Sequence, residues 1–289
     1  MQTAGTTGFS AFKVNTAIWL IWQQVLLRAG FYCDRGIAVA CDQSHFPGPG
    51  TSWHAGGSGK RSEAKMAEYV VEFGKDGSRV EPDGRLDAAA FHRNHQPIWR
   101  VLEPFLREKS GNVVEAGSGT GQHVVEFARH TPRIVWWPSD LNDRHLDSIR
   151  AWRSHAQLAN IRDPMRIDLS DPQWCPQMHD DSGPGKLLAV FCANVIHIAP
   201  WRVAEGLIAG ASRYLRPDGR LFIYGPFKRD GRHTAVSNAV FDTSLRDGNP
   251  EWGLRDVEAV GRLAEATGLA LVDIAEMPAN NLVLVLARS

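Results

Sequence analysis

The stretch that decides the fold runs Val113-Val114-Glu115-Ala116-Gly117-Ser118-Gly119-Thr120-Gly121-Gln122-His123. Two β-branched residues lead into an acidic residue, three glycines alternate with small residues, and a helical pattern follows from Val124. This order predicts a buried strand, a tight turn and the start of a helix, because glycine permits positive φ and lets a ligand approach the backbone. A dinucleotide fingerprint reads G-x-G-x-x-G, whereas this loop reads G-x-G-x-G.

Periodicity predicts alternating strands and helices around this loop. Strands are expected over 133–140, 165–169, 187–194, 220–227, 270–277 and 282–287, and helices from Asp87, from Pro97 and over 142–155, 200–215 and 256–267. The run 187–194 is apolar throughout, as in a central parallel strand buried on both faces. The last two strands are joined by a tight turn and must be antiparallel. A small hairpin with an Asp76-Gly77 turn is expected before the first helix.

Two of these strands end in a carboxylate. Asp140 lies about twenty residues after Gly121, where a carboxylate accepts both ribose hydroxyls of a nucleotide. The alternative is that Asp140 caps the following helix. Asp168 ends the next strand and either accepts from an adenine amino group or is a solvated acid. Asn194 and Val195 follow the central strand, where open α/β sheets bind ligands.

Residues 1–65 differ from the rest of the chain. The apolar run 17–22 is too short and too interrupted for a transmembrane helix, and 46–60 has linker composition. Ordinary globular composition begins at Met66. We therefore expect a disordered or non-native extension over 1–65, explained by a misassigned start, and a single working domain over 66–289.

Charge is balanced, with 32 Lys plus Arg against 32 Asp plus Glu. This balance gives no electrostatic footprint for nucleic acid or an acidic lipid surface, so we expect a small-molecule partner and neither nucleic acid nor membrane. The 4 cysteines lack C-x-x-C spacing, which argues against a zinc site or disulfide framework. Such cysteine usage fits a reducing, cytoplasmic location without a bound metal. Nothing in the sequence indicates the oligomeric state.

From about Leu86 to the C-terminus the chain resembles the methyltransferase-like 26 family, also filed as domain of unknown function 938. The matching stretches are Arg93-Asn94 with Pro97-Ile98, Glu115 to His123, Trp137 to Asp140, Asn194 with His197-Ile198, Tyr224 to Phe227, Ser237-Asn238 with Phe241-Asp242 and Leu245-Arg246, Asn249 to Asp256, and Met277 to Asn281. The acidic residue before G-x-G-x-G resembles the first motif of S-adenosylmethionine-dependent methyltransferases. The resemblance implies a Rossmann-like α/β fold, with a mostly parallel seven-stranded sheet, a C-terminal antiparallel hairpin and helices on both faces. It also implies S-adenosylmethionine as cofactor but supplies no substrate.

This resemblance assigns residues to the cofactor. The expected set is Arg93, Glu115, Gly117, Ser118, Gly119, Gly121, Asp140, Asp168, Asn194 and Val195. In this scheme the loop backbone lies along the methionine and ribose, Glu115 lies near the ammonium, and Asn194 with Val195 borders the sulfonium. Arg93 pairs with the methionine carboxylate, a fork-to-carboxylate match, or alternatively forms a salt bridge on a helix.

On the acceptor side, His197 is the first candidate base, because a neutral imidazole can accept a proton near pH 7. The alternative is a partly buried histidine that hydrogen-bonds a loop. Tyr224 is the second catalytic candidate. Residues 228–253 contain no clear strand and are expected to form a lid or pocket wall. The pocket candidates are Asn238, Asp242, Trp252, which alternatively anchors a turn, and Arg255.

The sequence thus predicts methyl transfer from S-adenosylmethionine to a small-molecule acceptor. One alternative is a non-catalytic cofactor-binding or scaffold protein with the same fold. An NAD(P)-dependent oxidoreductase would also need an acid about twenty residues after a glycine loop. The loop spacing, Glu115 and the terminal hairpin disfavour that reading.

Overall fold

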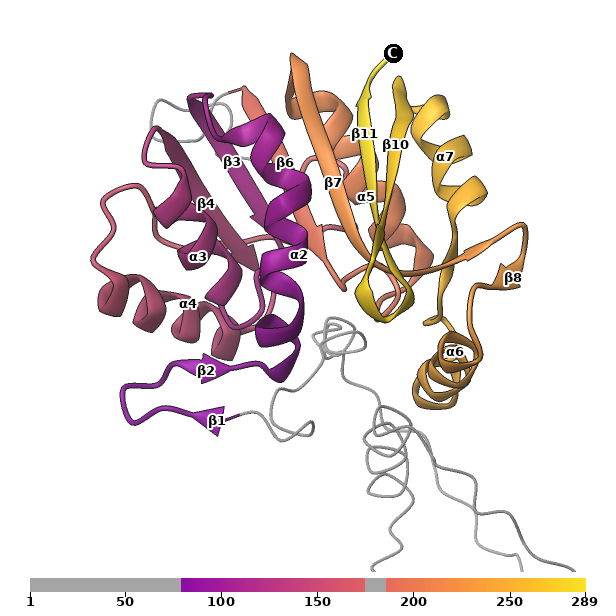
Figure 1. Ribbon diagram of the computed structural model, residues 1–289, viewed down its shortest axis with the longest axis horizontal. Helices are drawn as coiled ribbons and strands as arrows, with labels where there is room; N and C mark the ends of the chain where they lie inside the picture. The colour runs from indigo at the N-terminus through magenta and orange to yellow at the C-terminus, as the bar shows by residue number, and fades with distance from the viewer. Residues whose placement is uncertain (1–78, 175–185) are drawn as a thin grey trace, which may run out of the picture. The chain divides into compact units, whose positions relative to one another are not determined.

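The computed structural model describes residues 79–174 and 186–289 (Figure 1). The chain divides into two units, Met1–Glu68 and Tyr69–Ser289, and all the described residues belong to the second. The expectations for 1–65 and for the Asp76-Gly77 turn therefore lie outside the described residues. Within the described part of the chain, none of the helices has the length and apolar character that crossing a bilayer requires.

One mixed sheet forms the centre of the described unit. Its main strands are β3 (Gly111–Ala116), β4 (Ile134–Asp140), β5 (Met165–Arg166), β6 (Leu187–Ala193), β7 (Leu215–Arg229), β10 (Leu269–Met277) and β11 (Asn281–Arg288). They lie in the order β10-β11-β7-β6-β3-β4-β5. The pairs from β7 to β5 are parallel, and β11 runs antiparallel to both neighbours. The mostly parallel sheet with an antiparallel C-terminal hairpin is confirmed.

Helices cover both faces of this sheet. They are α2 (Ala89–Leu106), α3 (Gln122–His130), α4 (Asp143–Ala156), α5 (Trp201–Tyr214), α6 (Val236–Gly248) and α7 (Val257–Ala266). Figure 1 shows α2 in front of the sheet and α5 behind it. Successive strand residues enter opposite cores: Val113 and Phe191 pack with α2 and α3, whereas Val114 and Cys192 pack with α5 and α7. This alternation follows from the period of two in a strand, and it explains why β6 is apolar at every position.

Helix α2 corrects the prediction of two helices divided at Pro97. The helix continues through both Pro97 and Pro104. A proline inside a helix lacks the N–H for one backbone hydrogen bond and costs about 3 kcal/mol. Ile98, Leu102 and Leu106 are fully buried on the same helix, and each such burial stabilises by about 1.5–3 kcal/mol, so packing outweighs the local penalty.

Several shorter elements lie beside the main strands of the sheet. The strands β1 (Arg79–Val80) and β2 (Leu86–Asp87) form an antiparallel hairpin whose turn contains Gly84 at φ +87°. In the stretch expected to hold no strand, β8 (Arg232–His233) and helix α6 follow β7, and β9 (Arg255–Asp256) also pairs with β7. The 3₁₀ turn η2 (Pro278–Asn280) joins β10 to β11. The stretch 228–253 therefore contains a short strand and the 13-residue helix α6.

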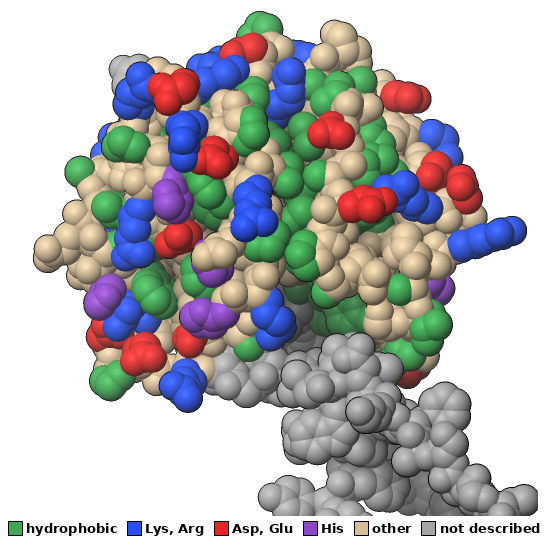
Figure 2. Space-filling view, viewed as in Figure 1, with side chains coloured by type: hydrophobic (Ala, Val, Ile, Leu, Met, Phe, Trp, Pro, Cys, Tyr) green, Lys and Arg blue, Asp and Glu red, His purple; other side chains and the backbone are tan. Residues whose placement is uncertain are grey.

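Surface charges are mixed on the face seen in Figure 2, where basic and acidic side chains are interspersed. Exposed ion pairs of the described residues include Arg133 with Glu108 and Arg150 with Asp147. Exposed pairs of this kind contribute about 0–1 kcal/mol each, so they add little to the stability of the fold.

Candidate functional site

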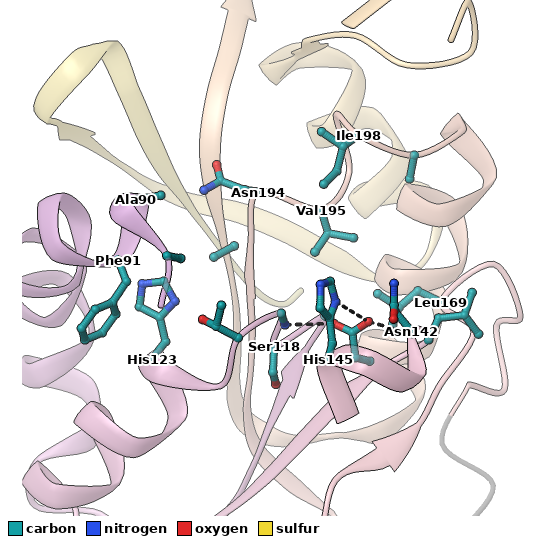
Figure 3. A pocket seen from close by; sticks show the side chains of 18 of the residues that line it. Ala90, Phe91, Ser118, His123, Asn142, His145, Leu169, Asn194, Val195 and Ile198 are labelled. Atoms are coloured by element: carbon teal, nitrogen blue, oxygen red, sulfur yellow. Dashed lines mark hydrogen bonds and ion pairs between the residues drawn. The ribbon is translucent and has the colours of Figure 1, made fainter. Parts of the chain in front are cut away.

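A cavity of about 290 Å³ lies at the carboxyl ends of the central strands. Its walls come from the start of α2, the loop 117–120, the end of β4, residues 167–169 and the stretch 193–199 after β6. Figure 3 shows Phe91 and His123 on one side, Asn142 and Leu169 on the other, and Ser118 between them. The size is close to the lower limit of about 300 Å³ for small-molecule pockets.

The glycine loop needs its glycines for two different reasons. Gly117, Gly119 and Gly121 all have positive φ. A Cβ on Gly117 would lie 2.5 Å from Cγ2 of Val195, and one on Gly121 would lie 3.0 Å from Ile149. At Gly119 nothing lies within 4 Å of the Cβ position. Gly117 and Gly121 thus permit close packing, whereas Gly119 leaves open space beside the cavity.

Asp140 is directed at this loop. Its Oδ2 accepts from the amide of Gly119 at 2.9 Å, and its Oδ1 accepts from the amide of Asn142 at 2.9 Å. The Nδ1 atom of His145 lies 3.1 Å from the same Oδ1. The side chain of Asn142, and not that of Asp140, caps α4 by accepting from the amide of Arg144. Asp140 lines the cavity, and the cap alternative is excluded for it.

Glu115 lies beneath the loop and does not line the cavity. The side chain is buried, and its Oε2 has no hydrogen-bond partner among the described residues. Burial raises the pKa of Glu115 to about 8, with the negative charge of Asp140 adding to the rise and a hydrogen bond to Ser118 opposing it. The carboxyl is therefore held mostly protonated at neutral pH.

The end of β6 carries a strained asparagine. Asn194 has φ +58°, a left-handed conformation that asparagine tolerates better than most residues. Its amide donates to the carbonyl of Tyr224 at 2.9 Å. Asn194 and Val195 both line the cavity, as do Gly117, Ser118, Gly119 and Asp140. Six of the ten expected cofactor residues are thus brought together.

The other four lie elsewhere. Gly121 packs against α4, and Glu115 is covered by the loop. Asp168 is absent from the lining, and its Oδ1 accepts from the amide and hydroxyl of Ser170, whereas its neighbours Ile167 and Leu169 face the cavity. Arg93 is exposed on α2 outside the lining.

His197 lies behind the cavity wall. It is buried against Gly225, where a Cβ would come within 2.3 Å of its Cε1. Burial lowers its pKa to about 3, with the positive charge of Arg255 adding to the shift. Its carbonyl accepts from the amide of Gly253. The burial favours the alternative of a structural histidine, although only the backbone of His197 bonds a loop and its ring Nδ1 has no partner among the described residues.

Tyr224 connects to two residues that sequence reasoning did not single out. The side chain of Asn94 lies near the Tyr224 hydroxyl and acts to lower its pKa, and Asn94 Oδ1 lies 2.8 Å from Nε2 of His123. Burial raises the pKa of Tyr224, and the Asn94 hydrogen bond and Arg93 oppose that rise. Asn94 and His123 line the cavity, whereas Tyr224 does not. The available signal was a polar residue four positions before Ile98, within the buried stripe of α2.

Among the four pocket candidates, Asn238 and Asp242 fix α6 to the rest of the unit. Asn238 Nδ2 donates to the hydroxyl of Thr234 and to the carbonyl of Asn280. Asp242 accepts from the amide of Leu254 and contacts three basic side chains, Lys228, His233 and Arg246. Both side chains are buried outside the cavity.

Trp252 and Arg255 support the cavity wall from behind. Trp252 packs in a small cluster with Leu245 and Leu254, against which Ile198 of the wall is packed. Arg255 donates to the carbonyls of Ile196, Ala199 and Glu251. Neither lines the cavity. Within residues 79–174 and 186–289, no three His, Cys, Asp or Glu side chains are grouped as metal ligands.

Comparison with solved structures shows the same fold. The chain matches an O-methyltransferase family protein from Burkholderia thailandensis at 20% identity and TM-score 0.58, covering 69% of this chain and 57% of that one. It matches CalO1, a methyltransferase in calicheamicin biosynthesis in its SAH-bound form, at 12% identity and TM-score 0.51, covering 67% of this chain and 54% of that one. It matches LepI in complex with SAM at 16% identity and TM-score 0.51, covering 67% of this chain and 47% of that one. The chain spans about half the length of these proteins, and the likeness establishes a Rossmann-like methyltransferase fold.

A family model identifies the chain more directly than these distant structures. The model is described as protein of unknown function DUF938, and it matches residues 85–288. The matched range begins in the β1–β2 hairpin and ends in β11, so it contains every residue of the cavity wall. The chain therefore belongs to the DUF938 family of proteins of unknown function.

Proposed function

We propose that this protein binds S-adenosylmethionine and transfers its methyl group to a small-molecule acceptor. The observation that carries this function is the placement of Asp140, whose carboxylate accepts a hydrogen bond from the amide of Gly119 and lines the same cavity as the glycine loop. The fold shared with methyltransferases, among them proteins solved with SAM or SAH, supports the same function.

The residues of the cavity fit this cofactor. Asp140 has the paired oxygens that ribose hydroxyls need, and Gly119 leaves space for a ligand beside it. Ile167 and Leu169 offer an apolar surface next to Asp140, suited to an adenine ring. Asn194 and Val195 border the centre of the cavity, where the sulfonium would lie.

When bound, S-adenosylmethionine supplies a methyl group already activated by its sulfonium. The protein then has to bind the cofactor, exclude water and hold an acceptor in line, and such positioning supplies up to about 7–11 kcal/mol of a barrier. Of the two candidate catalytic groups, Tyr224 is connected to the cavity by its neighbour Asn94, whereas His197 is buried behind the wall and does not line the cavity. Asn238, Asp242, Trp252 and Arg255 act on the acceptor side by holding the wall in place.

A second candidate function is cofactor binding without methyl transfer. It is favoured by one matched structure, titled "A Pericyclic Reaction enzyme", at 16% identity and TM-score 0.51. A fold of this kind therefore serves a protein described by a different reaction class. Binding and turnover have to be measured separately.

Calorimetric titration tests the cofactor. We expect S-adenosylmethionine and S-adenosylhomocysteine to bind and NAD(P) not to bind. Asp140→Asn should weaken both adenosyl ligands by about 10- to 100-fold, because it removes a charged acceptor. Asp147→Asn, at an exposed carboxylate on α4, is the matched control and should change neither affinity. Absence of binding by the wild-type protein would contradict the proposed function.

Radiolabelled S-adenosylmethionine then separates the two candidates. Transfer of label into a metabolite extract supports methyl transfer, and binding without transfer supports the second function. The same proposal includes membership of the methyltransferase-like 26 family and a cytoplasmic location. It also includes a partner that is neither nucleic acid nor membrane. These parts of the proposal are supported by the motifs and the charge balance.

A further inference from the structure

Three polar side chains from distant parts of the sequence meet at one end of the cavity. Asn94 from α2 lies between His123 from α3 and Tyr224 from β7. Asn94 is buried, and both it and His123 line the cavity. Figure 3 places His123 beside Phe91, away from Asn142 and Leu169 at the other end.

The hydrogen bonds determine which nitrogen of His123 carries the proton. The amide oxygen of Asn94 can only accept, so Nε2 of His123 donates to it at 2.8 Å. Asn94 acts to lower the pKa of Tyr224, which is the effect of an amide nitrogen directed at the hydroxyl, with the amide oxygen directed at His123. Nδ1 of His123 is consequently the unprotonated acceptor nitrogen.

The surroundings keep this imidazole uncharged. Its ring contacts Phe91, Phe127 and Phe191 at centroid distances of 5.2, 5.6 and 6.0 Å. Burial lowers the pKa of His123 to about 3, with His95 adding to the shift. A neutral imidazole offers a hydrogen-bond acceptor to a cation without charge repulsion.

Two other polar side chains near this end already have a partner. Asn94 Oδ1 accepts from His123, and the hydroxyl of Thr120 donates to Gln122. Glu115 lies beneath the loop and is absent from the lining. Among the described lining residues at the end opposite Leu169, His123 contributes an imidazole nitrogen that can accept a hydrogen bond.

Resting on the proposed function, which places the adenosine beside Asp140, we propose that Nδ1 of His123 accepts a hydrogen bond from the ammonium group of the cofactor's methionine tail. Asn94 is the positioning residue, because it fixes the tautomer that His123 needs. This gives His123 the role that the sequence suggested for Glu115. The tail then connects through Asn94 to Tyr224 on the acceptor side.

The test compares three ligands that share the adenosine. S-adenosylhomocysteine carries the complete tail, its deamino analogue lacks only the amino group, and 5′-methylthioadenosine lacks the tail. His123→Phe keeps an aromatic ring among the phenylalanines but removes the acceptor. Calorimetry with the full chain should show S-adenosylhomocysteine weakened about 10- to 100-fold and the other two ligands less than about 3-fold.

Asp140→Asn is the matched control, since it should weaken all three ligands by similar factors. His123→Phe could instead weaken the binding of all three ligands, or of none, while Asp140→Asn behaves as expected. Either result would overturn the role of His123 and leave the proposed function standing. Failure of the wild-type protein to bind any of the three would overturn both.

If His123→Phe does not fold, as judged by circular dichroism, Asn94→Leu gives the same comparison. This substitution leaves the imidazole of His123 in place but removes the hydrogen bond that keeps the proton on its Nε2. A loss confined to S-adenosylhomocysteine is expected, and an equal loss of all three ligands would contradict the proposal.

Discussion

A carboxyl buried under a glycine loop is an unusual residue to find in a stable domain. Glu115 has one oxygen without a partner among the described residues, and its negative neighbour Asp140 disfavours ionisation further. Such a group lowers stability when it is charged, because a buried charge needs compensating partners. The position is therefore expected to make folding depend on pH.

Glu115→Gln should remove this dependence. The folded-state pKa is raised from 4.5 to about 8, so the contribution of Glu115 to stability is fully present below pH 4.5 and is lost as pH rises through 8. Relative to Glu115→Gln, the wild-type free energy of unfolding should fall by roughly 3–4 kcal/mol between about pH 5 and pH 8, since one unit of pKa shift is about 1.4 kcal/mol. Urea unfolding across this range measures it.

The exposed Glu108 provides the control. Its carboxylate is on the surface, so Glu108→Gln should follow the wild-type curve. A pH profile of Glu115→Gln that is parallel to that of the wild type would show that the buried carboxyl does not titrate in this range.

Two aspartates show how far residue type alone carries a prediction. Asp140 and Asp168 both end expected strands, and both were expected to bind the cofactor. Asp140 faces the glycine loop, whereas Asp168 bonds Ser170 while its neighbours face the cavity. The observed β5 ends at Arg166, two residues earlier than Asp168, so alternation beyond that strand could not be inferred from the pattern.

At the scale of elements, the unit β3-loop-α3 organises the cavity. The loop turns tightly because three glycines adopt positive φ, and Val195 from the stretch after β6 packs directly on the first of them. This packing joins two neighbouring strand ends into one wall. Substitution at Gly117 should therefore affect both folding and the cavity.

Gly117→Ala should lower the free energy of unfolding by about 2–5 kcal/mol, combining left-handed strain of about 1–2 kcal/mol with about 1–3 kcal/mol from overpacking against Val195. Gly84→Ala isolates the backbone strain, because Gly84 has φ +87° with nothing within 4 Å of its Cβ position. Denaturant unfolding measures both. Adding Val195→Ala to Gly117→Ala should recover part of the loss, and no recovery would count against the packing explanation.

The elements were easier to predict than their limits. The central strand, the glycine loop and the C-terminal hairpin follow from local patterns and are observed. The prediction that a helix boundary lies at Pro97 was wrong, because the burial of residues further along α2 outweighs the local cost of a proline inside the helix. Helix α6 was missed because buried polar residues, Asn238 and Asp242, interrupt its apolar stripe.

At the scale of the whole molecule, Asp242 ties several segments together. One buried carboxylate contacts Lys228 on β7, His233 on β8, Arg246 on α6 and the amide of Leu254. Burial acts to raise its pKa, but the hydrogen bond from His233, the Leu254 amide, Lys228 and Arg246 outweigh burial and hold the pKa below 3.8. The wall residue Ile198 packs against this region.

Asp242→Asn should lower the free energy of unfolding by about 2–4 kcal/mol at pH 7, because three basic groups lose their common partner. A depressed folded-state pKa gives stability that is present above about 3.8 and is lost as pH falls, so the difference from wild type should shrink at acid pH. Chemical unfolding at several pH values measures this. Asp247→Asn, at an exposed position on the same helix, should be neutral, and a pH-independent difference for Asp242→Asn would argue against the charge network.

The amino-acid sequence by itself determined the order of the seven main strands, the position of the glycine loop and the antiparallel ending. These follow from period-two and helical patterns and from glycine at positive φ, all of which are local. Only the tertiary structure decided which polar residues share a cavity. It joined Asn94 to His123 and placed His197 and Asp242 behind the wall. The physical reason is that side-chain direction and burial depend on packing between segments far apart in the chain, which no local pattern encodes.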